Sequence, residues 1–206
     1  MKKIQIQNEE LLEVLNDISN TFNSIDKPNS ITLFGEPDDN EYYTSEEFLD
    51  LQVQTEHDGY GATISHGMDL NNNGSVSLEV NKFVTSIDQR LKPILSTGQS
   101  AVKMYYPENG FMHWHNNHNV PGYNILLSYT QNGKGWFRYR DPLTHEIVTM
   151  HDEPGWTAKV GYYGSNEEPD KIYWHCARAY EDRFTLGYVI PNLDIWQLMV
   201  EDIQDR

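Results

Sequence analysis

Apolar residues recur at helical spacing in three stretches of the chain. Residues 8–22, 80–95 and 193–203 each present one apolar face at the period of an α-helix. In the first stretch these positions are Leu11, Leu12, Leu15, Ile18 and Phe22. Between the first two stretches the chain is polar and acidic, and residues 35–41 (GEPDDNE) are typical of a surface loop.

From residue 101 onward the pattern changes to short β-rich runs separated by turn dipeptides such as NG, DP and PG. The predicted strands are residues 101–106, 111–115, 123–130, 135–140, 146–150, 157–164, 171–176 and 184–190. So many short strands with turns between them predict a sandwich or a jelly-roll barrel, preceded by helices. The helix predicted for residues 193–203 is expected to cover one face of that barrel.

Composition supports a globular protein. The chain has 206 residues, which is enough for one domain with a sizeable core, and 38% of them are hydrophobic. The formal net charge of −16 opposes binding to phosphate backbones, which attract clustered Lys and Arg. We therefore expect no nucleic-acid partner.

Location is predicted from what the sequence lacks. No apolar run reaches the roughly 18 residues of a membrane-spanning helix, and the start MKKIQIQNEE has no apolar stretch typical of a signal peptide. The single cysteine, Cys176, excludes an intrachain disulfide and fits a reducing compartment. We expect a cytoplasmic protein with no membrane partner.

The stretch HWHNNH, residues 113–118, holds three imidazoles and two carboxamides. Alternate residues of a strand share a face, so we expect His113, His115 and Asn117 to lie on one side. Two imidazoles on that side suggest a metal site that needs a further imidazole from a distant strand. His175, in the predicted strand 171–176, is the best candidate.

Arg183 and Thr185 follow His175 and share one face of the next predicted strand. A guanidinium can bind a carboxylate through two hydrogen bonds, and a hydroxyl can add a third. The two residues therefore predict a site for an acidic group close to the histidines.

This order of a strand-end histidine, a distant histidine and then Arg-x-Thr resembles the Fe(II)/2-oxoglutarate-dependent oxygenases, most closely their prolyl-4-hydroxylase-like branch. The resemblance covers about residues 101–190. Residues 106–110 (YPENG) are similar to the approach to the first metal ligand in that branch. The segment from Trp114 to Pro142 is similar to versions of the enzyme carried by tailed phages.

The resemblance implies a mainly β fold with flanking helices: a double-stranded β-helix (jelly roll) with N-terminal helices packed on one sheet. Within a single domain, residues 1–100 would form a helical and loop support region. Residues 101–190 would form the catalytic core, and residues 191–206 a C-terminal segment.

The resemblance also implies Fe(II) held by His115 and His175. The family's usual third ligand is an Asp two residues after the first His, and this chain has Asn117 there. The third ligand would then be the side-chain carbonyl oxygen of Asn117, His113 on the same predicted face, or water or another residue. Asp141 or Asp152 could supply a carboxylate from elsewhere, although their spacing gives no support for it.

By the same resemblance, Arg183 and Thr185 would bind the distal carboxylate of 2-oxoglutarate. Tyr105 and Tyr106 point in opposite directions on a strand, so only one of them can face the co-substrate, and we expect it to be Tyr106.

The expected activity is that of a dioxygenase. It would use O2 to hydroxylate a prolyl or other amino-acid-type substrate, free or within a peptide or protein, with decarboxylation of 2-oxoglutarate to succinate. The alternative is a cupin-like metal-binding protein that uses His113, His115 and His175, or a catalytically weak pseudoenzyme of the same fold that acts as a binding module. The sequence identifies neither the substrate nor the oligomeric state.

Overall fold

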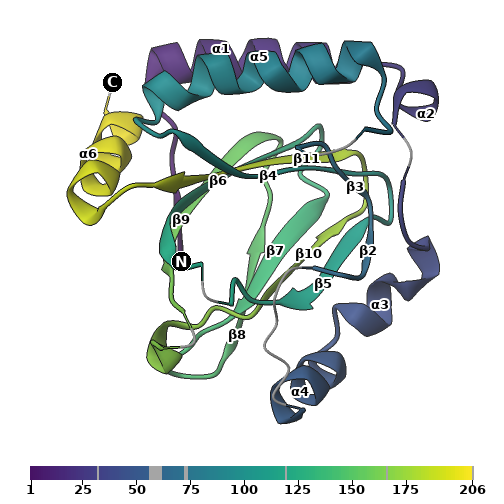
Figure 1. The fold of residues 1–206 in the computed structure, drawn as a ribbon, viewed down its shortest axis with the longest axis vertical. Coiled ribbons are helices and arrows are strands. Elements are labelled where there is room, and N and C mark those ends of the chain that lie inside the picture. The colour runs from purple at the N-terminus through teal and green to yellow at the C-terminus, as the bar shows by residue number, and fades with distance from the viewer. Residues whose placement is uncertain (32, 56–61, 72–73, 119, 166, 206) are drawn as a thin grey trace.

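A computed structural model describes residues 1–31, 33–55, 62–71, 74–118, 120–165 and 167–205. Within these residues the fold is mainly β, with two antiparallel sheets and helices outside them (Figure 1). The larger sheet has the strand order β1 (Lys2–Ile4), β9 (Gly155–Tyr163), β6 (Gly122–Thr130), β11 (Arg183–Ile190), β4 (Gln99–Tyr106) and β3 (Met68–Asp69). The smaller sheet has the order β2 (Ser65–His66), β5 (Phe111–His115), β10 (His175–Ala179), β7 (Gly135–Arg140) and β8 (Ile147–His151).

From β4 onward, successive strands pass from one sheet to the other, except that β7 and β8 are neighbours in the smaller sheet. Strands that are far apart in the sequence therefore become partners. Strand β10 pairs with β5, and β11 lies between β4 and β6. This connectivity brings the end of β5, the start of β10 and the start of β11 to one interior.

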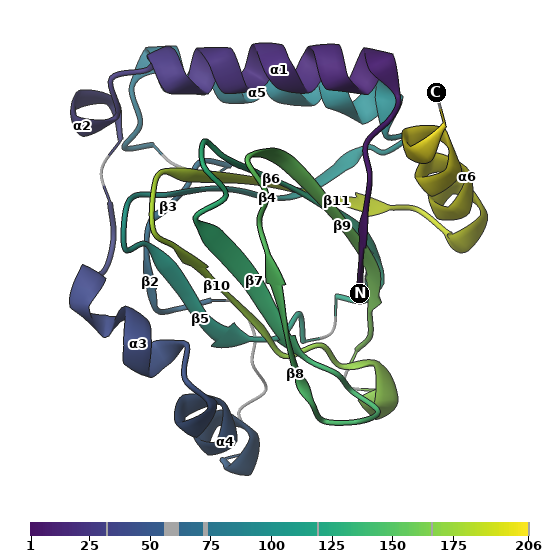
Figure 2. The same cartoon turned by 180° about the vertical axis from the view of Figure 1, so that it is seen from behind.

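Helices α1 (Glu9–Ser24) and α5 (Leu78–Ile94) lie side by side on the outer face of the larger sheet (Figures 1 and 2). The side chains of Asn8 and Ser77 cap them, each accepting a hydrogen bond from a backbone N–H of the first turn. Their apolar faces follow the helical spacing predicted from the sequence, which explains why both predictions come close to the observed ends.

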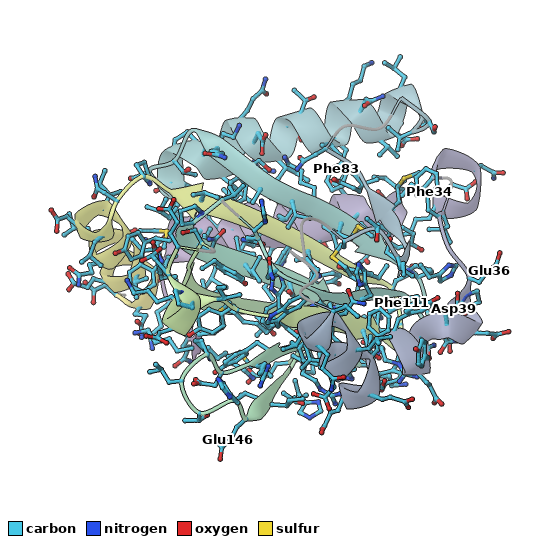
Figure 3. All side chains as sticks on the ribbon, turned by 60° about the horizontal axis from the view of Figure 1, so that its bottom comes forward. Phe34, Glu36, Asp39, Phe83, Phe111 and Glu146 are labelled. Carbon is cyan, nitrogen blue, oxygen red and sulfur yellow. The ribbon has the colours of Figure 1, made fainter. Side chains whose placement is uncertain are left out.

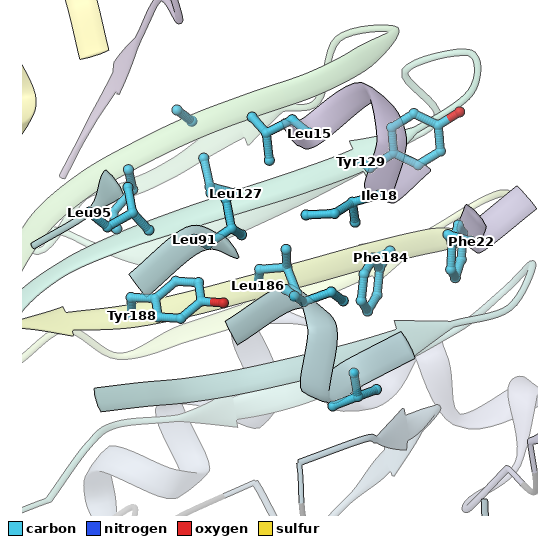
Figure 4. Packing of buried hydrophobic residues seen from close by; sticks show 14 of the residues in the cluster. Leu15, Ile18, Phe22, Leu91, Leu95, Leu127, Tyr129, Phe184, Leu186 and Tyr188 are labelled. Atoms are coloured by element: carbon cyan, nitrogen blue, oxygen red, sulfur yellow. The ribbon is translucent and has the colours of Figure 1, made fainter. Parts of the chain in front are cut away.

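The main core lies between these two helices and the sheet (Figure 4). Leu15 and Ile18 of α1 are buried in the same cluster as Leu127 of β6. The rings of Phe22 and Phe184 stack with their centroids 4.8 Å apart. Packing of this density fixes the sheet whose opposite face lines the candidate site.

Helices α3 (Asn40–Tyr43) and α4 (Glu46–Gln54) cover the outer side of the smaller sheet. Phe48 of α4 is buried there with Trp114 and Cys176. The surface loop predicted for residues 35–41 is instead partly helical. Its sequence is polar, and the apolar residues that hold the helices on the sheet come later in the chain.

The first hundred residues also contribute strands. β1, β2 and β3 lie at sheet edges, and none is longer than three residues, so they leave no periodicity in the sequence. The strand predicted for residues 171–176 is displaced: Pro169–Lys171 form a 3-10 helix, and β10 begins at His175.

The remaining helices are the short α2 (Lys27–Ser30) and α6 (Leu193–Gln204), which follows β11. The indole of Trp196 in α6 donates a hydrogen bond to the carbonyl of Asn124 in β6 over 3.2 Å, which joins the helix to the larger sheet. In the part of the chain that is described, no helix has the length and apolar character to cross a membrane.

We expect Leu15→Ala to lower the free energy of unfolding by about 2–5 kcal/mol. Leu15 lies on the buried face of α1 and is fully buried, so the truncation leaves a cavity. Urea denaturation followed by circular dichroism measures the change. Leu198→Ala on α6 is the matched control, since Leu198 is 65% exposed. Equal losses for the two variants would contradict the assignment of the core.

Candidate functional site

A cavity of about 770 Å³ lies between the two sheets. This volume is within the range of small-molecule sites in proteins. Its wall includes His115, Asn116, Asn117, His175, Arg183, Thr185, Tyr106 and Ser128. The structure therefore brings these singled-out residues, from four different segments, to the surface of one cavity, together with Ser128 from a fifth segment.

The two histidines meet through the pairing of β5 with β10. His115 and His175 are directly opposite each other in the register of the two strands. Their ring centroids are 4.1 Å apart, and both side chains are largely buried. Two imidazoles this close, on one cavity wall, could hold a cation between them.

The hydrogen bonds of the two rings fix which nitrogen is available. Nδ1 of His115 lies 2.8 Å from the carbonyl oxygen of His113, and Nδ1 of His175 lies 2.8 Å from that of Tyr173. A carbonyl oxygen accepts and never donates, so each Nδ1 carries the proton and each Nε2 keeps a lone pair. This is the tautomer of a histidine that binds a metal through Nε2.

Burial lowers the pKa of both imidazoles. The pKa of His115 falls to about 4. Burial, reinforced by the neighbouring His115, also lowers the pKa of His175 well below its ordinary value. Both rings are therefore neutral at pH 7, which is the protonation state that a metal ligand requires.

His113 does not join this pair, and the expectation that it shares a face with His115 was wrong. His175 pairs with His115 but Ala177 pairs with Met112, so β5 carries an extra residue, as in a β-bulge. The bulge reverses the alternation: Met112 and His115 line the cavity, whereas the ring of His113 packs edge-on against Phe48.

The Nε2 atom of His113 is also engaged, because it accepts a hydrogen bond from the backbone N–H of Thr63 over 3.0 Å. A ring held in this way cannot turn into the cavity without losing that bond. The structure therefore disfavours the arrangement in which three histidines hold the metal.

Two carboxamides follow the end of β5. The Oδ1 atom of Asn116 accepts a hydrogen bond from the backbone N–H of His118 over 2.7 Å, so it is committed to the turn. Asn117 lies beside it on the cavity wall. Its carbonyl oxygen is a neutral candidate for a third ligand.

No carboxylate completes a triad, since the described residues contain no group of three or more His, Cys, Asp or Glu that could hold a metal ion. The two aspartates considered from the sequence have other partners. Asp141 accepts hydrogen bonds from the backbone of the β7–β8 turn, and Asp152 is bonded to buried cations. Among the described residues the donor set is thus two imidazoles and a carboxamide, which fits a divalent cation that also takes ligands from a bound molecule.

Arg183 lies elsewhere on the same wall, at the start of β11, and is 1% exposed. Its guanidinium donates to the hydroxyl of Thr185 over 2.6 Å and to that of Ser128 over 3.0 Å. It lies over the ring of Tyr106 at 5.5 Å. Ser128 is the register partner of Thr185 on β6, which explains how both hydroxyls reach one guanidinium.

The remaining side of the guanidinium is held by Asp152. Nε of Arg183 donates to one oxygen of Asp152 over 2.7 Å, and Lys159 donates to the other over 2.6 Å. Burial raises the pKa of Asp152, but the charges of Arg183 and Lys159 outweigh it and hold that pKa well below its usual range. Two buried cations therefore share one carboxylate, and a bound anion would balance the remaining charge.

The close approach of these groups depends on Gly135. A Cβ atom at this position would lie 2.8 Å from Oδ2 of Asp152 and 3.2 Å from Cδ of Arg183. The glycine at the start of β7 thus leaves the space in which the ion pair forms.

Of the two adjacent tyrosines, Tyr106 faces the cavity and Tyr105 faces the outer core. The phenol of Tyr105 donates to Asp182 over 3.0 Å. Burial raises the pKa of Tyr106, so its phenol stays protonated and able to donate a hydrogen bond.

Sequence reasoning did not find Ser128 or Lys159. Lys159 had a signal, because a lysine stands inside an otherwise apolar strand (TAKVGYY). Ser128, in YNILLSYT, has no distinguishing pattern until its register against Thr185 is known.

Comparisons with known proteins give limited similarity. No family model matches the chain, and no curated protein matches it. A prolyl-4-hydroxylase from Pseudomonas putida is 14% identical over 85% of this chain and 98% of its own, with a TM-score of 0.36. YcfD, a ribosomal oxygenase from Escherichia coli, is 17% identical over 67% of this chain and 35% of its own, with a TM-score of 0.32.

CapF, solved with the inhibitor 3-isopropenyl-tropolone, is 17% identical over 45% of this chain and 25% of its own, with a TM-score of 0.27. The chain thus spans well under two thirds of the CapF and YcfD chains. Likenesses of this size carry no argument about the reaction, and the family resemblance seen in the sequence stays a prediction.

We expect His115→Ala to lower the affinity for Fe(II) by more than the roughly 10–100-fold that loss of an outer-shell partner costs, because it would remove one of the two expected direct ligands. His113→Ala on the same strand is the matched control and should bind Fe(II) nearly as the wild type does. Anaerobic titration calorimetry measures both. A comparable loss in His113→Ala would show that the bulge does not separate the two rings.

Proposed function

We propose that this protein is an Fe(II)- and 2-oxoglutarate-dependent oxygenase built on a double-stranded β-helix. One observation carries the proposal. A pair of neutral imidazoles with available Nε2 atoms shares a cavity with a buried guanidinium that has no full counter-charge. A metal-chelating dicarboxylate is a ligand that uses both features, and the strand order from β4 to β11 agrees with the proposed fold.

In this proposal His115 and His175 hold Fe(II). The third ligand is the side-chain carbonyl oxygen of Asn117 or a water molecule. The distal carboxylate of 2-oxoglutarate meets Arg183 and Thr185. Bound Fe(II), with 2-oxoglutarate and O2, supplies the oxidising chemistry, in which the co-substrate is decarboxylated to succinate.

The chain's own residues orient and protect the site. The rings of Phe137 and Tyr163 lie 5.5 and 5.1 Å from that of His175, so the cavity wall beside this histidine is aromatic. Tyr106 keeps its proton beside Arg183. Its hydroxyl donates to the weak acceptor Sδ of Met112 over 3.8 Å and would donate to the co-substrate in its place. The low dielectric of such an aromatic wall strengthens charge interactions beside it.

The proposed substrate is a prolyl or other amino-acid-type group, free or within a peptide or protein. Part of the cavity wall is exposed and apolar: Phe34 is 53% exposed and lies at the outer edge of the molecule (Figure 3), and Val120 is 48% exposed. Exposed apolar side chains at a cavity suit a substrate that extends beyond it.

The carboxamide at position 117, where the family has a carboxylate, favours a second candidate function, a catalytically weak module of the same fold that binds its ligand without turnover. Such a module would keep the histidine pair and Arg183 as binding groups. The two candidates differ in whether succinate is formed.

The test begins with the wild-type protein, loaded anaerobically with Fe(II) and 2-oxoglutarate. We expect a weak metal-to-ligand charge-transfer band in visible absorbance and formation of succinate once air is admitted. The band without succinate would favour the binding module, and the absence of both would refute the proposal.

Arg183→Met should weaken 2-oxoglutarate binding on the order of tenfold or more while leaving Fe(II) affinity unchanged. Equal losses of both would remove Arg183 from its proposed role.

We expect Asn117→Asp to bind Fe(II) more tightly than the wild type, because a carboxylate is a stronger ligand than a carboxamide. Asn116→Asp is the matched control, since the Asn116 side chain is committed to the backbone N–H of His118. Anaerobic calorimetry with Fe(II) compares the two. An unchanged affinity in Asn117→Asp would place this side chain away from the metal.

A further inference from the structure

Lys159 is a fully buried lysine close to the candidate site. Its Nζ donates to Oδ1 of Asp152 over 2.6 Å, and Asp152 in turn holds Nε of Arg183. Arg183 and Ser128 are among the described residues that line the cavity, whereas Lys159 is not. Lys159 can therefore affect a ligand through charge but not through contact.

The charges of these three side chains determine what Arg183 can bind. Asp152 by itself would neutralise Arg183, and a neutral pair deep in a protein gives little to offset the desolvation of an incoming carboxylate. With Lys159 protonated, the group carries one net positive charge. A single carboxylate then restores neutrality inside the cavity.

We propose that Lys159 is a positioning residue that acts through Asp152 and sets the net charge of the Arg183 subsite, so that the subsite takes a carboxylate group. This inference rests on the proposed function. Lys159 does not line the cavity, yet in this inference the affinity for the co-substrate depends on whether Lys159 is charged.

The surroundings of Lys159 make its charge adjustable. Burial lowers the pKa of Lys159 to about 8, Asp152 opposes that shift, and Arg183 and Lys3 add to it. Lys3, its register partner on β1, is itself paired with Glu153 over 2.7 Å. A carboxylate bound at Arg183 would raise this pKa again, so binding and protonation are coupled.

The decisive measurement is calorimetric titration of the protein, loaded with redox-inert Mn(II), with 2-oxoglutarate at pH values on either side of 8. Both carboxylates of the ligand stay ionised throughout. For the wild type we expect affinity to fall as pH rises through 8, because Lys159 loses its proton. Repetition in buffers of different ionisation enthalpy should show proton uptake on binding above pH 8.

Variants separate charge from packing. Lys159→Met should bind 2-oxoglutarate on the order of tenfold more weakly at pH 7, with no proton uptake and a flat pH profile. Lys159→Arg keeps the charge at all these pH values and should bind tightly on both sides of 8. The matched control is Lys103→Met, which removes another buried lysine of the same sheet, paired with Asp88 over 2.9 Å. It should keep the wild-type affinity and pH profile.

A wild-type affinity that is flat across pH 8 without proton uptake would overturn the inference, even if Lys159→Met fails to fold. So would Lys159→Met binding as tightly as the wild type. Either result leaves the proposed function standing, provided that the wild type binds 2-oxoglutarate. A wild type that binds no 2-oxoglutarate at any pH would refute the proposed function and the inference with it.

Discussion

The interior of this protein depends on one carboxylate shared by two buried cations. Asp152, between β8 and β9, bonds Arg183 of β11 through one oxygen and Lys159 of β9 through the other. A buried charge that loses its partner typically costs about 3–5 kcal/mol, so this group constrains three segments at once. The same group leaves a positive charge facing the cavity. Folding and the proposed selection of an acidic ligand would therefore both depend on Asp152.

The second constraint is the register between β5 and β10, which places His115 opposite His175. The sequence predicted that these rings meet, from the order of a strand-end histidine, a distant histidine and then Arg-x-Thr. It did not predict the bulge. An extra residue in β5 depends on how a distant strand pairs with it, and alternation within one strand carries no record of that pairing. His113 was misplaced for this reason.

The same distinction separates the parts of the fold that could be predicted from those that could not. Helices α1 and α5 follow from their apolar spacing, since each buries a single continuous face. The edge strands β1, β2 and β3 could not be predicted, because they form only through pairing with strands far along the chain. The same holds for helices α3 and α4, which pack on the smaller sheet. Asp152 illustrates the limit for the site: its residue type suggested a metal ligand, and its neighbours Arg183 and Lys159 give it another role.

The charge around Arg183 in the cavity is positive, whereas the net charge of the whole chain is negative. The net charge is −16, but exposed charges are screened beyond about 8 Å at physiological salt. Arg183 and Lys159 act at short range inside a low-dielectric interior, where each charge counts for more. A neutral Asn117 beside the histidine pair adds no negative charge, so a divalent cation there would keep more of its attraction for an anion than it would beside a carboxylate. A ligand with acidic groups at both ends then gains from the metal and from Arg183 together, whereas one with a single acidic group must leave one of these positive charges unmatched.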